Sequence, residues 1–370
     1  MYRKIMGFLE AWKESEHRKP LILQGARQVG KTYSILEFGR THYENVAYFN
    51  FETNPKLNET FEENISPDYL IPILSHIAGQ TIVKEKTLIV FDEVQLCERA
   101  LTSLKYFCEN APDYHIIVAG SLLGVAVNRA KFSFPVGKVD MKTLYPMDME
   151  EFMLALGEDD LVEQIKKCFQ TDTPLPSALH DAAMQLYRQY LVVGGMPECV
   201  MQFAQTKDYI LVRHTQDTIL ASYLNDMSKY NTKNEIKKKR LTYDNITVQL
   251  SKKNTRFQYK LIKKGGRASE FENAIEWLCL SGIVSQVYRV EQIKKSLENY
   301  RDIDSFKIYV SDMGLLCAKK DLSPVDVLYM VDEINDFKGG MAENYVNVQL
   351  AVNGYHTYYW ETDRGAEIDF

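Results

Sequence analysis

The sequence has no uninterrupted apolar run of about 18 residues, the length that a membrane-spanning helix requires. Residues 1–10 mix charged and apolar side chains, so they lack the apolar core and the cleavage site of a secretory signal. The six cysteines include no C-x-x-C pair, which disfavours a zinc site and suits free thiols in a reducing compartment. We therefore expect a cytoplasmic protein that makes no membrane contact.

A local excess of charge of one sign stands out in only one region of the sequence. The 370 residues are 45% apolar and 25% charged with a net charge of −6, which argues against nucleic-acid binding by the chain as a whole. Residues 229–267 are the exception, because they hold thirteen Lys and Arg against only Glu235 and Asp244. Such an excess indicates a partner of opposite sign, and DNA is one candidate. A solvated basic face and an acidic protein partner are the alternatives.

Residues 25–32 match the pattern G-x-x-x-x-G-K-[ST] without a mismatch. Residues 20–23 before them predict a short buried strand, and residues 33–38 after them predict the start of a helix, which is the setting of a phosphate-binding loop. Glycine lets the backbone curl so that successive N–H groups point at phosphate oxygens, and the helix start adds further N–H groups. The alternative is a glycine turn that only begins a helix. The candidate nucleotide-binding residues are Gly25, Ala26, Arg27, Gln28, Val29, Gly30, Lys31, Thr32 and Tyr33.

Four side chains are expected to carry most of the chemistry. We expect the Lys31 ammonium to reach the β- and γ-phosphates and the Thr32 hydroxyl to ligate Mg²⁺. Residues 86–91 form an apolar strand pattern that ends in Asp92 and Glu93, as a buried parallel strand does where it meets a site. Asp92 is placed to hold Mg²⁺ with Thr32, and Glu93 to orient and deprotonate the attacking water. Two solvated acids at a strand end are the alternative.

A weaker signal lies at the tip of the apolar strand predicted over residues 115–119. Ser121 is placed to hydrogen-bond the γ-phosphate or the water, or else to cap the following helix. Gln95, just beyond Glu93, is a further candidate to contact the nucleotide or a neighbouring group. The predicted catalytic residues are therefore Lys31, Glu93 and Ser121.

The base and the charge-stabilising group are less specified. The guanine-specifying pattern [N/T]-K-x-D is absent, because residues 206–209 place the acid one position early. Adenine is the default base, so ATP with Mg²⁺ is the expected ligand. Arg129, Arg188 and Arg213 are candidates for an arginine that acts in cis or from a neighbouring subunit, and each has a surface or packing role as its alternative.

The alternation of strands and helices up to residues 145–146 predicts a parallel three-layer α/β domain. Residues 147–228 read as amphipathic helices that would form a lid over the nucleotide. Within residues 229–300 a helix, a turn, a second helix, a glycine and a strand follow the layout of a winged helix. The sequence stops on an apolar strand pattern, so we expect a further C-terminal part or a partner that completes it.

Several segments also form a recognisable set: residues 25–32, 91–95, 119–121, 144–147, 194–198, 241–284, 311–316, Glu343 and residues 367–370. In these segments the chain resembles a large prokaryotic group of AAA-type ATPases that carry a C-terminal restriction-endonuclease-like domain of unknown function. The resemblance covers essentially the whole chain, and its later segments are the specific ones. It implies an α/β ATPase core over residues 1–160, a helical lid over 161–228, a winged-helix-like module over 229–300 and an incomplete nuclease-like part over 301–370.

Two departures from this group limit what the resemblance implies. The group usually has Gly-Arg before the Leu-Tyr-Pro turn, whereas this chain has Gly137 and Lys138, and a lysine cannot form a planar bidentate clamp. A nuclease site of this type also needs a Glu-x-Lys after the metal-binding Asp. Glu343 and Asp369 are two candidate ligands, but the third element is not in the sequence. We therefore expect no DNA cleavage by this chain.

The function expected from the sequence is ATP hydrolysis with Mg²⁺, coupled to movement of the basic module, in a chain that is a candidate for homo-oligomerisation. The competing reading is an ATP-gated switch or a DNA-binding module with negligible turnover.

Overall fold

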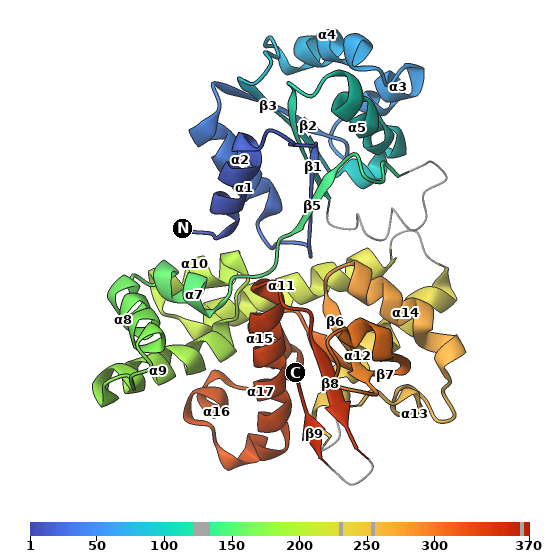
Figure 1. The fold of residues 1–370 in the computed structure, drawn as a ribbon. Helices are drawn as coiled ribbons and strands as arrows, with labels where there is room; N and C mark the ends of the chain where they lie inside the picture. Colours follow the sequence, from blue (N-terminus) through green and yellow to red (C-terminus); the bar gives the residue numbers. More distant parts are fainter. Residues whose placement is uncertain (121–133, 229–231, 253–255, 363–365) are drawn as a thin grey trace. The chain divides into compact units, whose positions relative to one another are not determined.

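The computed structural model describes residues 1–120, 134–228, 232–252, 256–362 and 366–370. The chain divides into two compact units, which are taken separately below (Figure 1). The α/β unit is Arg3–Tyr145, and the C-terminal unit is Pro146–Phe370 together with the first two residues. The predicted end of the α/β domain at residues 145–146 agrees with this division, whereas the implied ATPase core to residue 160 would add the first helix of the C-terminal unit.

The α/β unit is built on a parallel sheet. Its strands are β1 (Leu21–Gln24), β2 (Asn45–Asn50), β3 (Thr87–Asp92), β4 (His115–Gly120) and β5 (Asp140–Thr143). They lie in the order β2-β3-β4-β1-β5, and every neighbouring pair is parallel. Because the strands are parallel, their carboxyl ends lie at the same edge of the sheet, where α/β proteins bind ligands. The order places the ends of β3, β4 and β1 next to one another there.

Apolar runs in the sequence mark the middle of this sheet. Every residue of β3 and β4 is buried, as expected for parallel strands covered by helices on both faces. The strand β5 at one edge has the polar sequence Asp-Met-Lys-Thr and is only partly buried, which suits an edge strand. The sequence pattern therefore follows the position of each strand in the sheet.

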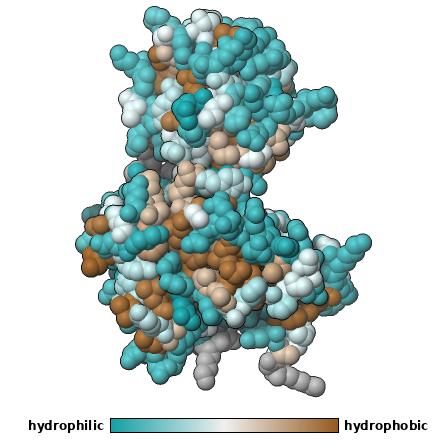
Figure 2. Space-filling view, turned by 90° about the vertical axis from the view of Figure 1, so that its left-hand side faces the viewer, coloured by the Kyte–Doolittle hydropathy of each residue, from teal (hydrophilic) through white to brown (hydrophobic). Residues whose placement is uncertain are grey.

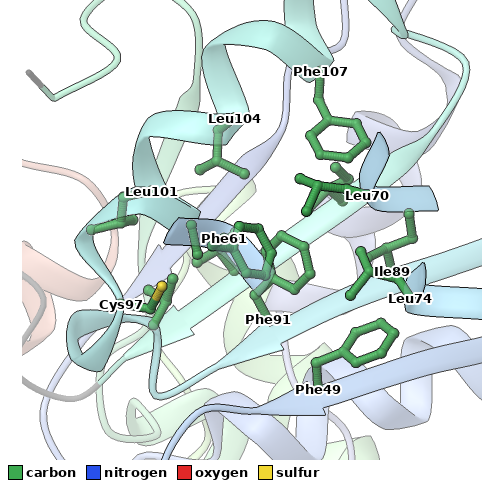
Figure 3. Close-up of a cluster of buried hydrophobic side chains, with 14 of the residues drawn as sticks. Phe49, Phe61, Leu70, Leu74, Ile89, Phe91, Cys97, Leu101, Leu104 and Phe107 are labelled. Carbon is green, nitrogen blue, oxygen red and sulfur yellow. The ribbon is translucent and has the colours of Figure 1, made fainter. Parts of the chain in front are cut away.

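Helices cover the faces of the sheet. Their bounds are α1 (Ile5–Glu14), α2 (Lys31–His42), α3 (Lys56–Glu63), α4 (Pro67–Ala78), the 3₁₀ turn η1 (Val94–Leu96) and α5 (Glu98–Asn110). Figure 3 shows side chains of α3, α4 and α5 gathered against β2 and β3. At the centre of this cluster the rings of Phe61 and Phe91 are perpendicular, with centroids 5.5 Å apart. The core therefore fixes the end of β3, where Asp92 and Glu93 follow Phe91.

The C-terminal unit begins with helices, as predicted for residues 147–228. They are α7 (Met149–Ala155), α8 (Asp159–Gln170), α9 (Ser177–Val193), α10 (Pro197–Thr206) and α11 (Tyr209–Ser228). Asp148 starts α7 with a capping box, because its side chain accepts from the Glu151 N–H and the Glu151 carboxylate accepts from the Asp148 N–H. Gly194 and Gly195 separate α9 from α10.

At these two glycines, the backbone packs directly against the buried carboxylate of Asp312. The Asp312 carboxylate accepts a hydrogen bond of 2.6 Å from the Gly195 N–H and one of 2.8 Å from the Leu315 N–H. A Cβ on Gly195 would lie 2.0 Å from the Met147 carbonyl oxygen, and one on Gly194, whose φ is +75°, would lie 2.3 Å from Asp312. The two glycines therefore allow the backbone to close on Asp312.

A helical segment followed by a hairpin occupies the basic region. The elements are α12 (Lys233–Leu250), α13 (Tyr259–Ile262), α14 (Ala268–Leu280), β6 (Val284–Val290), the 3₁₀ turn η2 (Leu297–Tyr300) and β7 (Arg301–Val310). β6 and β7 are antiparallel, and Arg256 forms an isolated bridge to Lys307 of β7. The boundary implied at residue 300 therefore falls between two strands that pair with each other.

The remaining elements extend the same sheet. They are α15 (Met313–Lys319), α16 (Pro324–Tyr329), the 3₁₀ turn η3 (Asp332–Ile334), α17 (Asn335–Val352), β8 (Tyr358–Glu361) and β9 (Glu367–Ile368). The sheet order is β7-β6-β8-β9, with β8 parallel to β6 and antiparallel to β9. Among the described residues, no helix has the length and apolar character needed to cross a membrane. On the face in Figure 2, hydrophobic residues of the C-terminal unit gather in the middle and are interrupted by hydrophilic ones.

One buried histidine gives the α/β unit a pH-dependent stability. His115 begins β4, and its Nδ1 lies 2.8 Å from the Tyr43 hydroxyl. Its Nε2 is buried and has no hydrogen-bond partner among the described residues. Burial, followed by the positive charges of Arg18 and Lys13, lowers the pKa of His115 to about 4 from 6.5.

Because the pKa of His115 is lower in the folded state, the unfolded chain takes up the proton first as pH falls through 6.5 towards 4. We predict that the free energy of unfolding of this unit falls by about 2 kcal/mol between pH 7 and pH 5 from this group alone. His115→Gln should remove that part of the pH dependence. Urea unfolding at the two pH values measures it, and a variant as pH-sensitive as the parent would contradict the prediction.

Candidate functional site

The loop at residues 25–32 connects β1 to α2 at the carboxyl edge of the sheet. Gly25 has φ +147°, and a Cβ there would lie 2.1 Å from the Leu144 carbonyl oxygen. Gly30 has φ +91° and directly precedes α2, and no side chain in the described part of the chain caps this end of the helix. The start of α2 therefore has no side-chain cap among the described residues, and the N-terminus of a helix attracts a ligand that carries negative charge.

Lys31 lies inside this loop. Its ammonium donates to the carbonyl oxygens of Gly25 and Ala26, at 2.9 and 2.8 Å, and the residue is 8% exposed. These two acceptors keep the positive charge within the curl of the backbone. A phosphate oxygen that entered the loop could take the place of either carbonyl.

An arginine outside the motif, near the start of the chain, supports the loop. The Arg3 guanidinium, which is buried, donates to the Val29 carbonyl oxygen at 3.0 Å and to the Tyr145 carbonyl oxygen at 2.8 Å. It thereby ties the phosphate-loop backbone to the last residue of the α/β unit. The sequence analysis did not single out Arg3.

The two predicted metal ligands are in direct contact. The Thr32 hydroxyl of α2 donates to Asp92 Oδ2 at 2.9 Å. Asp92, at the end of β3, is 5% exposed, and its Oδ1 accepts from the Glu93 N–H at 3.0 Å. The structure thus brings together residues that are 60 positions apart in the sequence.

This pair fits Mg²⁺ by the chemistry of its donors. Mg²⁺ takes oxygen ligands and is usually held by one or two protein groups together with water and substrate phosphates. A threonine hydroxyl has one proton and two lone pairs, so it can donate to Asp92 and still offer a lone pair to a cation. The hydroxyl and the carboxylate therefore suit the outer side of a magnesium–nucleotide complex beside Lys31.

A tyrosine that the sequence analysis did not identify completes the Asp92 environment. The Tyr48 hydroxyl of β2 donates to Asp92 Oδ2 at 2.7 Å. Partial burial raises the pKa of Tyr48 to about 12, and the hydrogen bond to Asp92 acts in the same direction against that from Asn50, so Tyr48 remains a donor at neutral pH. No residue pattern in the sequence indicates this contact, because it depends on the register between β2 and β3.

Glu93 lies next to this cluster in a left-handed backbone conformation, with φ +52°. Its carboxylate accepts a hydrogen bond from Gln95 Nε2. Gln95 therefore contacts a neighbouring group, which is one of the two roles expected for it. Burial raises the pKa of Glu93, and the charge of Asp92 acts in the same direction. A carboxylate that is poorly solvated is a better proton acceptor than an exposed one.

The other predicted residues belong to the C-terminal unit or lie outside the described residues. Ser121 and Arg129 lie outside the described residues. Arg188 of α9 is exposed, and Arg213 of α11 donates to the Leu322 carbonyl oxygen and pairs with Asp321 at 3.6 Å. Within its own unit Arg213 therefore has a packing role.

The two acids considered for a second metal site surround a lysine. Lys307 Nζ of β7 is 3.2 Å from Glu343 Oε2 and 2.8 Å from Asp369 Oδ1, and the lysine side chain is 6% exposed. Burial alone would lower the pKa of Lys307, but the two carboxylates outweigh it and raise the pKa. Among the described residues, no group of three or more His, Cys, Asp or Glu side chains is arranged to hold a metal. The pair is thus neutralised by an ammonium.

Two family models match the chain, one mainly in the α/β unit and one in the C-terminal unit. Residues 17–153 match a family model described as an AAA domain, and residues 184–326 match a domain of unknown function, DUF8612. No curated protein matches the chain.

Solved structures include similar folds at low identity. A Walker-type ATPase of Pyrococcus abyssi is 13% identical, with a TM-score of 0.52 over 86% of this chain and 95% of that chain. The ORC2 protein of Aeropyrum pernix is 12% identical over 92% and 95% of the two chains, with a TM-score of 0.43. The family match and the first likeness support an AAA-type P-loop fold for the α/β unit, which confirms the predicted fold class of this part.

Proposed function

We propose that the chain binds ATP with Mg²⁺ and hydrolyses it at the carboxyl edge of the α/β sheet. The observation that carries the proposal is the contact between the phosphate-loop helix and the end of β3, through Thr32 and Asp92, with Lys31 beside them in the loop. The AAA-domain match supports it.

The roles follow from the positions of the side chains. The backbone N–H groups of residues 25–32 and the Lys31 ammonium would hold the phosphates, with Lys31 exchanging the Gly25 and Ala26 carbonyls for phosphate oxygens. Thr32 and Asp92 would hold Mg²⁺, which, when bound, supplies positive charge to the β- and γ-phosphates. The nucleotide-binding set also includes Arg27, Gln28 and Tyr33.

Glu93 would take the proton of the attacking water. It directly follows the metal carboxylate, and its burial favours proton uptake. Ser121, the residue that follows β4 in the sequence, is proposed to contact the γ-phosphate. Most of the rate would come from charge that is already in place around the phosphates.

The test of hydrolysis is Glu93→Gln, which keeps the shape of the side chain and removes the base. We predict that ATP affinity stays within about twofold and that turnover falls by about 10²–10⁴-fold. Glu52→Gln is the matched control, because Glu52 is an exposed acid whose charge also raises the pKa of Glu93. Steady-state phosphate release and nucleotide titration measure both quantities.

The same measurement separates the two functions considered. A parent protein that binds ATP but releases phosphate no faster than Glu93→Gln would be an ATP-gated switch. A parent protein with turnover that only Glu93→Gln abolishes would be an ATPase.

We further propose that ATP hydrolysis is coupled to movement of the basic module of the C-terminal unit. The order α12, bridge at Arg256, α13, α14 and the β6–β7 hairpin supports a winged-helix-like module, and DNA is its proposed partner. The nuclease-like assignment of residues 301–370 remains a hypothesis from the resemblance, and the ion pairs of Lys307 give no support to metal binding there.

The charges on this module favour phosphate contacts over reading of base edges. On α12, Lys233, Lys237 and Arg240 are exposed at positions three and four apart, so they share one face. The exposed side of α14 instead presents Glu272 and Glu276, which would repel a DNA backbone. Contact through α12 would be governed by charge and would weaken as salt rises.

Some lysines of the basic region do not belong to this face. Lys239 is buried with its ammonium 4.6 Å from the centroid of the Trp277 ring, and Asp244 pairs with Lys319 at 3.1 Å. Lys229 and Lys253 lie outside the described residues. A variant meant to test DNA binding should therefore leave Lys239 in place.

Neutralising Lys233, Lys237 and Arg240 together to Gln should lower the slope of log affinity against log salt by about 2–3 on duplex DNA. Neutralising Lys166, Lys167 and Lys207, which are exposed on α8 and after α10, is the control with the same change in net charge. Fluorescence anisotropy at a series of salt concentrations measures the slopes. Equal slopes for the parent and both variants would rule out this face as the contact.

A further inference from the structure

Asp92 is held by more hydrogen bonds than its place in the motif requires. Its Oδ2 accepts from the Thr32 hydroxyl at 2.9 Å and from the Tyr48 hydroxyl at 2.7 Å, and its Oδ1 accepts from the Glu93 N–H at 3.0 Å. The Thr32 and Glu93 donors lie within the two sequence motifs. Tyr48 lies in neither, so its contact with the carboxylate needs a separate explanation.

The pairing of β2 with β3 places Tyr48 there. Asn50 is opposite Asp92 in the parallel register, and Tyr48 is two residues earlier on the same strand. Side chains two residues apart project from the same face of a strand, so Tyr48 and Asn50 both lie beside the carboxylate. Tyr48 is 38% exposed.

Asn50 fixes the direction of the phenol proton. Its Oδ1 accepts from the backbone N–H groups of Glu52 and Thr53, at 2.9 and 3.0 Å, which leaves its amide nitrogen facing Tyr48. Asn50 Nδ2 then donates to the Tyr48 oxygen at 3.2 Å. Since the phenol has one proton and its oxygen already accepts from Asn50, the proton is left to donate to Asp92.

We propose that Tyr48 is a positioning residue for the metal: its hydroxyl, oriented by Asn50, holds the Asp92 carboxylate in the rotation that presents an oxygen to Mg²⁺. This inference rests on the proposed ATP–Mg²⁺ function. Ligating carboxylates depend on such outer hydrogen bonds, and loss of one typically costs about 10–100-fold in metal affinity or activity. Tyr48 touches neither nucleotide nor water in this role.

Tyr48→Phe removes the hydroxyl and keeps the ring. We predict that Mn²⁺, used as the probe, binds the complex of the full chain with ADP about tenfold more weakly, and that ADP binding without metal is unchanged. Electron paramagnetic resonance of free Mn²⁺ measures the first quantity, and calorimetry without metal measures the second. In turnover, the variant should need more Mg²⁺ but should reach the parental kcat when Mg²⁺ is saturating.

Tyr69→Phe is the matched control. Tyr69 of α4 also donates to a carboxylate, that of Glu63, but its hydroxyl is not part of the Asp92 cluster. The control should change none of these quantities. Parental Mn²⁺ affinity in Tyr48→Phe, or a kcat that stays low at every Mg²⁺ concentration, would overturn the inference while leaving the ATP site standing. A parent that binds no ADP would instead overturn the proposed function and this inference with it.

Discussion

The hydrogen bond between Thr32 and Asp92 joins the first turn of α2 to the end of β3, and the candidate site depends on it. It is possible because β4 separates β1 from β3 by one strand, so that the loop after β1 and the acids after β3 share an edge. The aromatic core around Phe61 and Phe91 fixes the end of β3 by packing against the residue before Asp92. Lys31, held by loop carbonyls, then lies in the same region as the carboxylate.

Most of the α/β unit could be predicted from the sequence for physical reasons. A phosphate loop needs glycine at fixed positions, and buried parallel strands need apolar runs, so both leave local signals. Tyr48 and Arg3 left none. Tyr48 reaches Asp92 only through the register of β2 on β3, and Arg3 reaches Val29 only after the chain has folded. Such contacts depend on tertiary structure, which a pattern of residue types does not encode locally.

The C-terminal unit shows the same limit. Its helices followed from their apolar periodicity. The contact that closes the break at Gly194 and Gly195 did not, because Asp312 lies more than a hundred residues later. The pairing of β6 with β7 crosses residue 300, where the resemblance implied a boundary. Likewise, Glu343 and Asp369 looked like metal ligands until the buried ammonium of Lys307 was placed between them.

The central claim is that backbone N–H groups and the ammonium of Lys31 bind the phosphates of ATP. Calorimetric titration of the parent, Lys31→Ala and Lys84→Ala with ATP and Mg²⁺ tests it most directly. Lys84 is an exposed lysine of the same unit that pairs with Asp113. The account predicts that Lys31→Ala loses at least about tenfold in affinity, since a charge-assisted hydrogen bond contributes about 1.5–3 kcal/mol, and that Lys84→Ala matches the parent. Equal affinity of all three proteins would contradict it.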